Sequence, residues 1–241
     1  MLSSILSLVS LLAAAAALPS TTHLDAVHRD VVKRDGPGYT CPTTAQPVAD
    51  SNDNGGKGVL LQNADSQTRS FYVYWNSCDL VPLSYIAVPP NQTAFIALPD
   101  LFQGRIVRGT DAVNLDGKAH LLGTWLEFTL DKTGKGYADV SLIRGCDGAV
   151  TVKALDGTNA STGFQKWLFD NVPADALETK PSGSQAIKAT EGAASVIVSA
   201  PRDYLAGQLG YGQAYIDDYH GDPVICSSNE RFGVTFYPGR P

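Results

Sequence analysis

The sequence predicts a mainly β domain, a β-sandwich with a smaller loop-rich, partly helical lobe. From residue 58 onward, short strand-like runs follow one another, separated by Pro, Gly, Asn and Asp. Several runs alternate polar and apolar residues, as half-buried strands do. Between 157 and 222 the pattern changes to loops and short helical segments. We therefore expect the sandwich at about 58–153 and 223–241, and the lobe at about 154–222.

Each expected strand is short, rich in β-branched or aromatic residues, and bounded by turn residues. The runs are 58–62, 70–75, 83–88, 93–97, 104–108, 124–130, 137–143, 149–153 and, at the end of the chain, 231–237.

The sequence of the lobe predicts three elements of secondary structure. Ser161 or Thr162 is expected to cap a short helix that places Phe164, Trp167 and Leu168 on one face. The run 194–199 (ASVIVS) is typical of a strand. The run 201–205 begins with Pro and favours a second short helix.

A hairpin-like stretch at 123–148 carries two acids. In 124–130, Glu127 shares a face with Trp125, and in 137–143, Asp139 shares a face with Tyr137. The polar turn 131–136 between these runs suits a hairpin. If the two strands pair, Glu127 and Asp139 face one surface.

The first 34 residues predict processing for export. Residues 1–17 hold an apolar run that ends in small residues, the pattern of a secretory signal peptide. Residues 18–34 end in Lys33-Arg34 and are expected to be a propeptide, cleaved at this dibasic pair; an ordinary exposed basic pair is the alternative. The mature domain is then 35–241, and we expect a secreted protein, extracellular or in the cell wall.

The charge of the mature chain is acidic. Removing three basic and two acidic residues with 1–34 lowers the 18 basic and 24 acidic residues to 15 and 22, a net charge of −7. Nucleic acids and anionic membranes recruit basic surfaces, so the charge argues against both as partners. A neutral ligand such as a polysaccharide remains compatible, and we expect a monomer.

Several kinds of site find no support in the sequence. His120 and His220 are the histidines of the mature part, which argues against a multi-histidine metal site and against a serine or cysteine triad. The run 134–136 (GKG) lacks the pattern of a phosphate loop. We expect no cofactor and no metal.

The cysteines and two sequons fit an exported chain. Four cysteines remain after processing, at 41, 78, 146 and 226, and predict two disulfides with three possible pairings. Asn91 and Asn159 begin N-glycosylation sequons.

Five blocks of the sequence resemble thaumatin-like proteins, and they occur in that family's order. They are 70–86 (SFYVYWNSCDLVPLSYI), 104–110 (GRIVRGT), 126–130 (LEFTL), 137–145 (YADVSLIRG) and 226–238 (CSSNERFGVTFYP). The family has about sixteen cysteines, so the resemblance is to a fungal secreted member with few cysteines. It implies a thaumatin-like β-sandwich, and it implies the pairings Cys41–Cys78 and Cys146–Cys226.

The resemblance also implies an acidic cleft between sandwich and lobe. In this family the cleft holds one Arg, one Glu and three Asp. Arg105, Glu127 and Asp139 match three of these positions, and Arg144 stands at the position of the second Asp. Asp222 fits the third Asp best, with Asp218 as an alternative.

The implied function is binding of cell-wall β-1,3-glucan or a related polysaccharide, with weak endo-β-1,3-glucanase activity. Glu127 is the expected acid and Asp139 the expected nucleophile or base, while Arg105 keeps one carboxylate ionised. Trp125 and Tyr219 are the expected aromatic partners of a sugar. Arg144 counts against strong activity if it enters the cleft.

Each of these residues has a simpler interpretation. Arg105 is then a surface charge of a strand, Glu127 and Asp139 lie on the solvent face of a hairpin, and Asp218 and Asp222 belong to a solvated acidic loop. The alternative function is a non-catalytic secreted effector or wall-interaction protein that uses the fold as a scaffold.

Overall fold

A computed structural model describes residues 39–241 of the chain. The predicted signal peptide (1–17) and propeptide (18–34) lie outside the described residues. Within 39–241, no helix has the length and apolar character needed to span a membrane.

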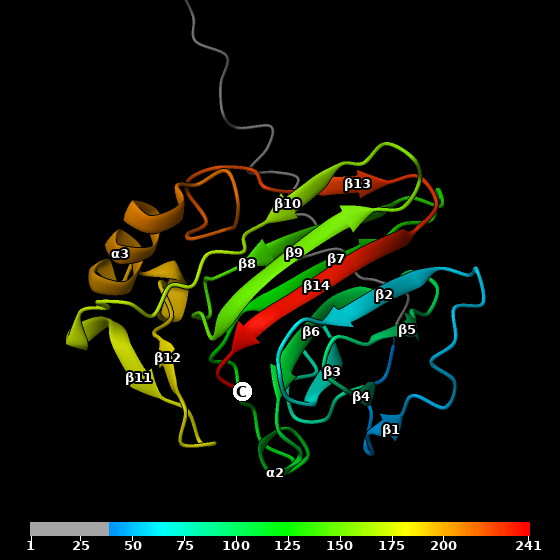
Figure 1. Cartoon of the computed structure of the whole chain (residues 1–241), viewed down its shortest axis with the longest axis horizontal. Coiled ribbons are helices and arrows are strands. Elements are labelled where there is room, and N and C mark those ends of the chain that lie inside the picture. The colour runs from blue at the N-terminus through cyan, green and yellow to red at the C-terminus, as the bar shows by residue number, and fades with distance from the viewer. Residues whose placement is uncertain (1–38) are drawn as a thin grey trace, which may run out of the picture. The chain divides into compact units, whose positions relative to one another are not determined.

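One sheet has seven strands, in the order β1-β4-β3-β6-β7-β8-β13 (Figure 1). Neighbouring strands are antiparallel except β1 and β4, which run parallel over two residues. The strands are β1 (Gln46–Pro47), β3 (Arg69–Trp75), β4 (Ser84–Val88), β6 (Gln103–Gly109), β7 (Trp125–Leu130), β8 (Gly136–Ser141) and β13 (Ile225–Ser227).

The second sheet has five strands, in the order β10-β9-β14-β2-β5. β14, the last strand of the chain, lies in the middle of this sheet, antiparallel to β9 and parallel to β2. The strands are β2 (Gly58–Asn63), β5 (Thr93–Ala97), β9 (Gly148–Ala154), β10 (Ser161–Gly163) and β14 (Arg231–Gly239).

The core lies between the two sheets because alternate residues of each strand are apolar. Leu126, Phe128 and Leu130 of β7 are at most 2% exposed. Aromatic pairs join the sheets: the rings of Phe128 and Phe232 have centroids 5.3 Å apart, and those of Phe71 and Phe236 are 4.7 Å apart. The predicted mainly β sandwich is confirmed, and each of the nine runs predicted as its strands overlaps a strand.

A second, smaller apolar group covers the other face of the seven-stranded sheet, which we call the outer face. Tyr72, Tyr74 and Val107 form its buried centre, with Tyr85 and Trp125 packed against them. The helix α2 (Asp111–Asn114) covers part of this face, since Tyr72 donates a hydrogen bond to Asp111 Oδ1.

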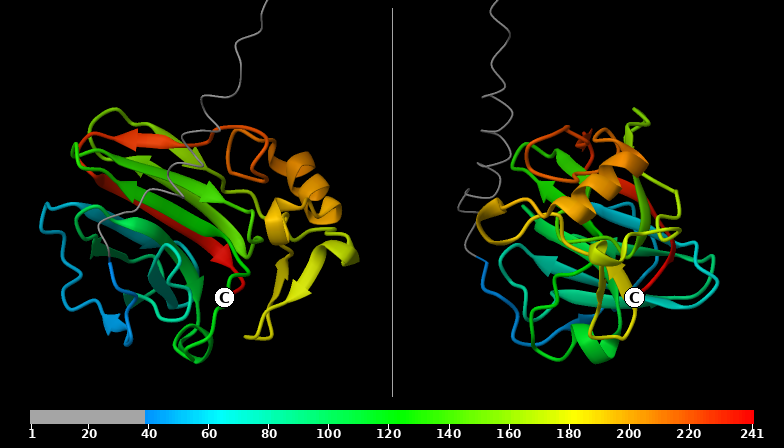
Figure 2. Two further views of the ribbon diagram at one scale, coloured as in Figure 1. Left: turned by 180° about the vertical axis from the view of Figure 1, so that it is seen from behind. Right: turned by 90° about the vertical axis from the view of Figure 1, so that its left-hand side faces the viewer.

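Along the chain, the lobe comes after β10 and before β13. Its helix and hairpin lie beside one end of the sandwich (Figure 2). It consists of η1 (Ala174–Ala176), β11 (Leu177–Thr179), β12 (Gln185–Ile187), η2 (Ala193–Ser195) and α3 (Ser199–Leu209). The helix predicted at 201–205 is confirmed within α3, where Pro201 occupies the first turn.

Two predicted elements of the lobe are wrong. The segment from Ser161 forms β10, because 161–163 pairs with β9 instead of capping a helix, so the sandwich extends beyond residue 154. The run 194–199 is not a strand: Ala194 and Ser195 have left-handed backbones in η2, and α3 begins at Ser199.

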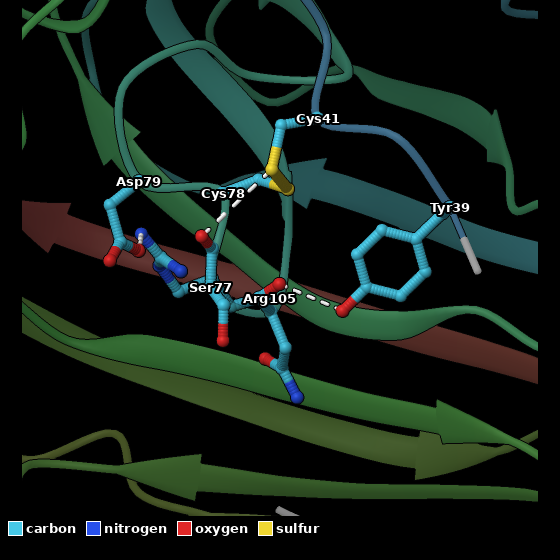
Figure 3. Close-up of a disulfide and its surroundings, with 7 residues drawn as sticks. Tyr39, Cys41, Ser77, Cys78, Asp79 and Arg105 are labelled. Atoms are coloured by element: carbon cyan, nitrogen blue, oxygen red, sulfur yellow. Dashed lines mark hydrogen bonds and ion pairs between the residues drawn. A yellow bond between two sulfur atoms is a disulfide. The ribbon is translucent and has the colours of Figure 1, made fainter. Parts of the chain in front are cut away.

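One predicted disulfide is confirmed and the other is wrong. Cys41 and Cys78 are bonded, with Cα atoms 5.3 Å apart (Figure 3). Cys146 and Cys226 are both free thiols.

Backbone pairing holds the two free thiols in different surroundings. Cys226 is exposed on β13, opposite Tyr137 of β8. Cys146 is buried: its backbone exchanges hydrogen bonds with Ile187, and its thiol contacts Thr124 Oγ1 at 3.6 Å. Burial raises the pKa of the Cys146 thiol to about 12, so it is unreactive at neutral pH.

The two sequon residues, Asn91 and Asn159, are exposed and adopt left-handed turn backbones. Both side chains are accessible to a glycosylating enzyme, and their glycosylation stays a prediction.

Candidate functional site

Three of the predicted site residues lie in one line across neighbouring strands. Arg105 of β6 is directly opposite Glu127 of β7, and Glu127 is directly opposite Asp139 of β8. Each has apolar neighbours in its strand that point into the core, so all three side chains belong to the outer face. Opposed residues of antiparallel strands have Cβ atoms about 4.5–5.5 Å apart. The prediction that Glu127 and Asp139 share a face is confirmed.

The carboxyl group of Asp139 lies in surroundings that disfavour its charged form. Its side chain is half-buried, and its Oδ1 is buried without a hydrogen-bond partner in the described part of the chain. Burial raises the pKa of Asp139 well above its usual value, and the charges of Glu127 and Asp222 raise it further. Asp139 therefore holds a proton more readily than an ordinary carboxyl group.

The lobe brings Asp222 and Tyr215 to the same place. Main-chain hydrogen bonds attach Tyr215 to β8: its N–H donates to Val140 O at 2.8 Å, and its carbonyl accepts from Leu142 N at 2.7 Å. The Tyr215 hydroxyl donates to Asp222 Oδ1 at 3.0 Å. We call Glu127, Asp139, Asp222 and Tyr215 the acidic cluster.

Tyr215 stays protonated in the acidic cluster. It is 6% exposed, and burial raises its pKa, as do the nearby charges of Asp139 and Asp222. The cluster therefore combines carboxylate oxygens, which accept hydrogen bonds, with a phenolic hydroxyl, which donates one. Sugar hydroxyl groups offer both partners.

Arg105 is buried instead of lying on the surface. It is 2% exposed, and its Nη2 donates to Asp79 Oδ1 at 2.7 Å (Figure 3). Its guanidinium carbon lies 4.0 Å from the ring centroid of Trp125 and 4.7 Å from that of Tyr74. The interpretation of Arg105 as an exposed strand charge is wrong. It lies under the outer face and supports the aromatic residues.

This packing limits what Trp125 can do. Arg105 occupies one face of its ring, and its Nε1 donates to Leu121 O at 2.9 Å. A sugar can therefore stack only on the opposite face of Trp125.

Sequence reasoning did not find Asp79 and Tyr74. Asp79 follows Cys78, whose disulfide fixes the loop in which it lies, and Tyr74 is opposite Arg105 on β3. The alternation of Tyr72 and Tyr74 with the core residues Phe71 and Val73 is the signal that places Tyr74 on the outer face.

Asp218 and Tyr219 have contacts of their own in the lobe. The N–H of Asp218 donates to Glu191 Oε1 at 2.7 Å, and its Oδ2 accepts from Ser195 Oγ at 3.4 Å. Tyr219 is 59% exposed and donates to Ser195 O at 3.3 Å. Asp222, the preferred match for the third Asp, has a charge that raises the pKa of Asp139.

Arg144 follows β8 in a turn, where its carbonyl accepts from Gly123 N at 3.0 Å. The charged groups that raise the pKa of Asp139 are both acids. An effect of Arg144 on the site stays a prediction. In residues 39–241, no group of three or more His, Cys, Asp or Glu side chains is arranged to hold a metal ion.

We expect Asp139→Asn to stabilise the folded protein at neutral pH. A carboxyl group whose pKa is raised by folding stabilises the fold fully below its unfolded pKa of about 4, and this contribution is lost as the pH rises through the folded pKa. The variant cannot ionise, so its melting temperature should exceed that of wild type by about 2 °C or more at pH 7. At pH 4 the difference should shrink.

Thermal melts of both proteins between pH 4 and 8 measure this effect. Asp100→Asn is the control, because the Asp100 side chain is 85% exposed. Identical pH profiles for wild type and Asp139→Asn would contradict a raised pKa.

Comparisons with known proteins give a likeness in structure but none in sequence. No family model matches the sequence, and no curated protein matches it. Among solved structures, the chain is similar to a structure described as the thaumatin-like xylanase inhibitor TLXI, with a TM-score of 0.41 and 11% sequence identity. The alignment covers 75% of this chain and 99% of that one.

Proposed function

We propose that the protein binds cell-wall β-1,3-glucan or a related neutral polysaccharide at the acidic cluster. The observation that carries this proposal is the direct opposition of Glu127 and Asp139 on the outer face, with Asp222 and Tyr215 beside them. Carboxylates are acceptors for sugar hydroxyls, and the accumulated negative charge disfavours anionic polymers. The ligand class comes from the resemblance of the sequence blocks to thaumatin-like proteins.

We propose a weak endo-β-1,3-glucanase activity as the chemical extension of this binding. Glycoside hydrolysis needs one carboxyl group that holds a proton and one that is ionised, about 5–5.5 Å apart in retaining enzymes. Cross-strand neighbours with Cβ atoms about 4.5–5.5 Å apart suit that spacing.

The raised pKa of Asp139 reverses the roles that the sequence predicted. Asp139, whose pKa is raised, is the proposed general acid, and Glu127 is the proposed nucleophile or base. Protonated Asp139 donates its proton to the departing glycosidic oxygen while Glu127 attacks the anomeric carbon. Water then releases the sugar, and Asp139 accepts a proton from that water.

The second candidate is a secreted, non-catalytic wall-interaction protein or effector. It is favoured by the burial of Asp139 Oδ1, which limits the access of a glycosidic oxygen to this carboxyl group. In both cases we propose that the protein acts outside the cell, after removal of residues 1–34.

Sedimentation with insoluble β-1,3-glucan tests the proposal. We expect wild type to bind, and Glu127→Gln and Asp139→Asn to bind about tenfold more weakly, the effect of losing about 1.4 kcal/mol. Asp100→Asn removes an equal charge at an exposed position and should bind like wild type. Reducing-sugar release from soluble β-1,3-glucan measures hydrolysis in the same samples.

The outcomes separate the two candidates. Absence of glucan binding by wild type contradicts the proposal. Binding without sugar release removes only the enzymatic part and supports the non-catalytic function. Equal binding by all variants places the glucan elsewhere on the protein.

A further inference from the structure

The loop that brings Asp222 to the acidic cluster is buried in its first half and exposed in its second. Residues 214–217 are buried, whereas 218–222 are exposed. At the end of the exposed half, Asp222 accepts a hydrogen bond from the Tyr215 hydroxyl at 3.0 Å. Exposed loop segments have few contacts and open more easily than core elements. The position of Asp222 therefore depends on the contacts made where the loop leaves the interior, at Asp218.

A buried carboxyl group contacts the loop at that point. Glu191 is 2% exposed, and its Oε1 accepts from the N–H of Asp218 at 2.7 Å. This hydrogen bond joins residues 27 positions apart in the chain. The residue before Glu191 fixes the same junction, since the Thr190 hydroxyl donates to Ile216 O and Thr190 N donates to Ile143 O at 3.0 Å. The start of the exposed half is therefore attached to a separate, buried segment of the lobe.

The surroundings of Glu191 disfavour its charged form. Burial raises the pKa of Glu191, the charges of Asp218 and Asp217 raise it further, and the hydrogen bonds from Asp218 N and Ser195 lower it. Within residues 39–241, no ion pair includes Glu191. A buried carboxyl group without a cation costs free energy. What Glu191 provides at this position is a hydrogen-bond acceptor, and a neutral acceptor of the same length would serve as well.

The turn next to this contact is stabilised by Asp217. Asp217 is 0% exposed, accepts from Tyr219 N at 3.0 Å, and lies 2.8 Å from His220 Nδ1. Its Oδ2 also forms an ion pair of 3.5 Å with Arg202 of α3. These contacts set the shape of residues 217–220. The hydrogen bond to Glu191 sets the direction in which the chain continues from Asp218.

We propose that Glu191 is a positioning residue of the acidic cluster, which holds Asp222 beside Asp139 through the main chain of Asp218. The charge of Asp222 raises the pKa of Asp139, so the placement of the loop has a measurable effect on the cluster. The glucan readout of this proposal rests on the proposed function. The titration of Asp139 needs no ligand and does not.

A carboxyl NMR titration of Asp139 tests the proposal, and the signal is assigned by its loss in Asp139→Asn. Glu191→Ala should lower the pH midpoint of Asp139, because the negative charge of Asp222 then lies farther away. Asp222→Asn removes that charge and should lower the midpoint in the same direction. In the Asp222→Asn background, Glu191→Ala should add little, since both changes act through one charge.

Two conservative variants separate the reach of Glu191 from its charge. Glu191→Gln keeps an oxygen at the same distance from Asp218 N and resembles the neutral carboxyl group, so the midpoint of Asp139 should stay as in wild type. Glu191→Asp keeps the carboxyl group and is one methylene shorter, so it should lower the midpoint as Glu191→Ala does. It decides the question if Glu191→Ala fails to fold.

Tyr204→Phe is the control for a general loosening of the lobe. The Tyr204 hydroxyl donates to Leu168 O at 2.8 Å and to Asp170 O at 3.0 Å, so this variant also removes bonds from a side chain to the main chain. It should leave the midpoint of Asp139 unchanged.

Sedimentation with insoluble β-1,3-glucan adds the functional readout. Glu191→Ala and Glu191→Asp should bind about tenfold more weakly than wild type, and Glu191→Gln should bind like wild type. If wild type does not bind glucan, the proposed function fails, and the titration of Asp139 alone decides on Glu191. Two results overturn the role of Glu191: a wild-type midpoint in folded Glu191→Ala and Glu191→Asp, or an equal lowering by Tyr204→Phe.

Discussion

Replacement of Asp147 by Asn is expected to lower the free energy of unfolding by about 3–5 kcal/mol. Asp147 is 2% exposed and its Oδ2 accepts from Lys180 Nζ at 2.9 Å, with Lys180 8% exposed. Its Oδ1 accepts from Thr124 N at 3.3 Å. Without the carboxylate, the buried ammonium group of Lys180 loses its charged partner. Urea unfolding followed by circular dichroism measures the loss.

A double variant shows whether the loss comes from the unpaired cation. Asp147→Asn combined with Lys180→Met should recover a large part of the stability, because no buried ammonium is then left without a partner. The exposed pair of Arg202 and Asp203 is the control, since Asp203 is 64% exposed and Asp203→Asn should cost at most about 1 kcal/mol. A similar small cost for Asp147→Asn would contradict this account of the buried pair.

Removal of the disulfide by Cys41→Ser and Cys78→Ser together is expected to cost about 4 kcal/mol. The bonded residues are 37 positions apart, and closing a loop of this length in the unfolded chain gives that value in the loop-entropy model. In the folded chain, few other contacts hold the first described segment: β1 pairs with β4 over two residues, and Tyr39 stacks on Trp75 with ring centroids 4.3 Å apart.

Differential scanning calorimetry of this double variant should show a melting temperature lower by about 8–16 °C, at about 2–4 °C per kcal/mol. Cys226→Ser is the matched control, because this thiol is free and exposed, and it should melt within about 2 °C of wild type. A marked destabilisation by Cys226→Ser would point to a bond at Cys226 and would reinstate the pairing with Cys146.

Most of the sandwich could be predicted because its strands are long enough to show their period. In β7, three core residues alternate with polar ones over six positions. β1, β10, β11, β12 and β13 have two or three residues each, which is too short for any period. Tertiary pairing also overrode local preference at 161–163, where an apparent helix cap is a strand against β9.

The parts of the site that follow from the alternation of residues along a strand could be predicted from the sequence. The contacts between segments distant in sequence could not. Glu127 and Asp139 share a face because both are out of phase with the core residues of their strands. The approach of Tyr215 to β8, and the burial of Arg105 against Asp79, involve segments distant in sequence, for which no local pattern exists. The wrong pairing of Cys146 with Cys226 came from the resemblance, while the backbone places these residues in separate surroundings.

Tyr74 and Arg105 are buried, so Glu127 and Asp139 are the accessible members of their line across the strands, and the step from one to the other runs perpendicular to the strands. A chain lying across the strands meets one new side chain every 4.7–4.9 Å or so, the distance between neighbouring strands. A chain lying along a strand meets one only about every 6.8 Å, at alternate residues. A polymer bound as proposed, across the strands, would meet Glu127 and Asp139 in succession and then reach the edge of the sheet at β13, the neighbour of β8.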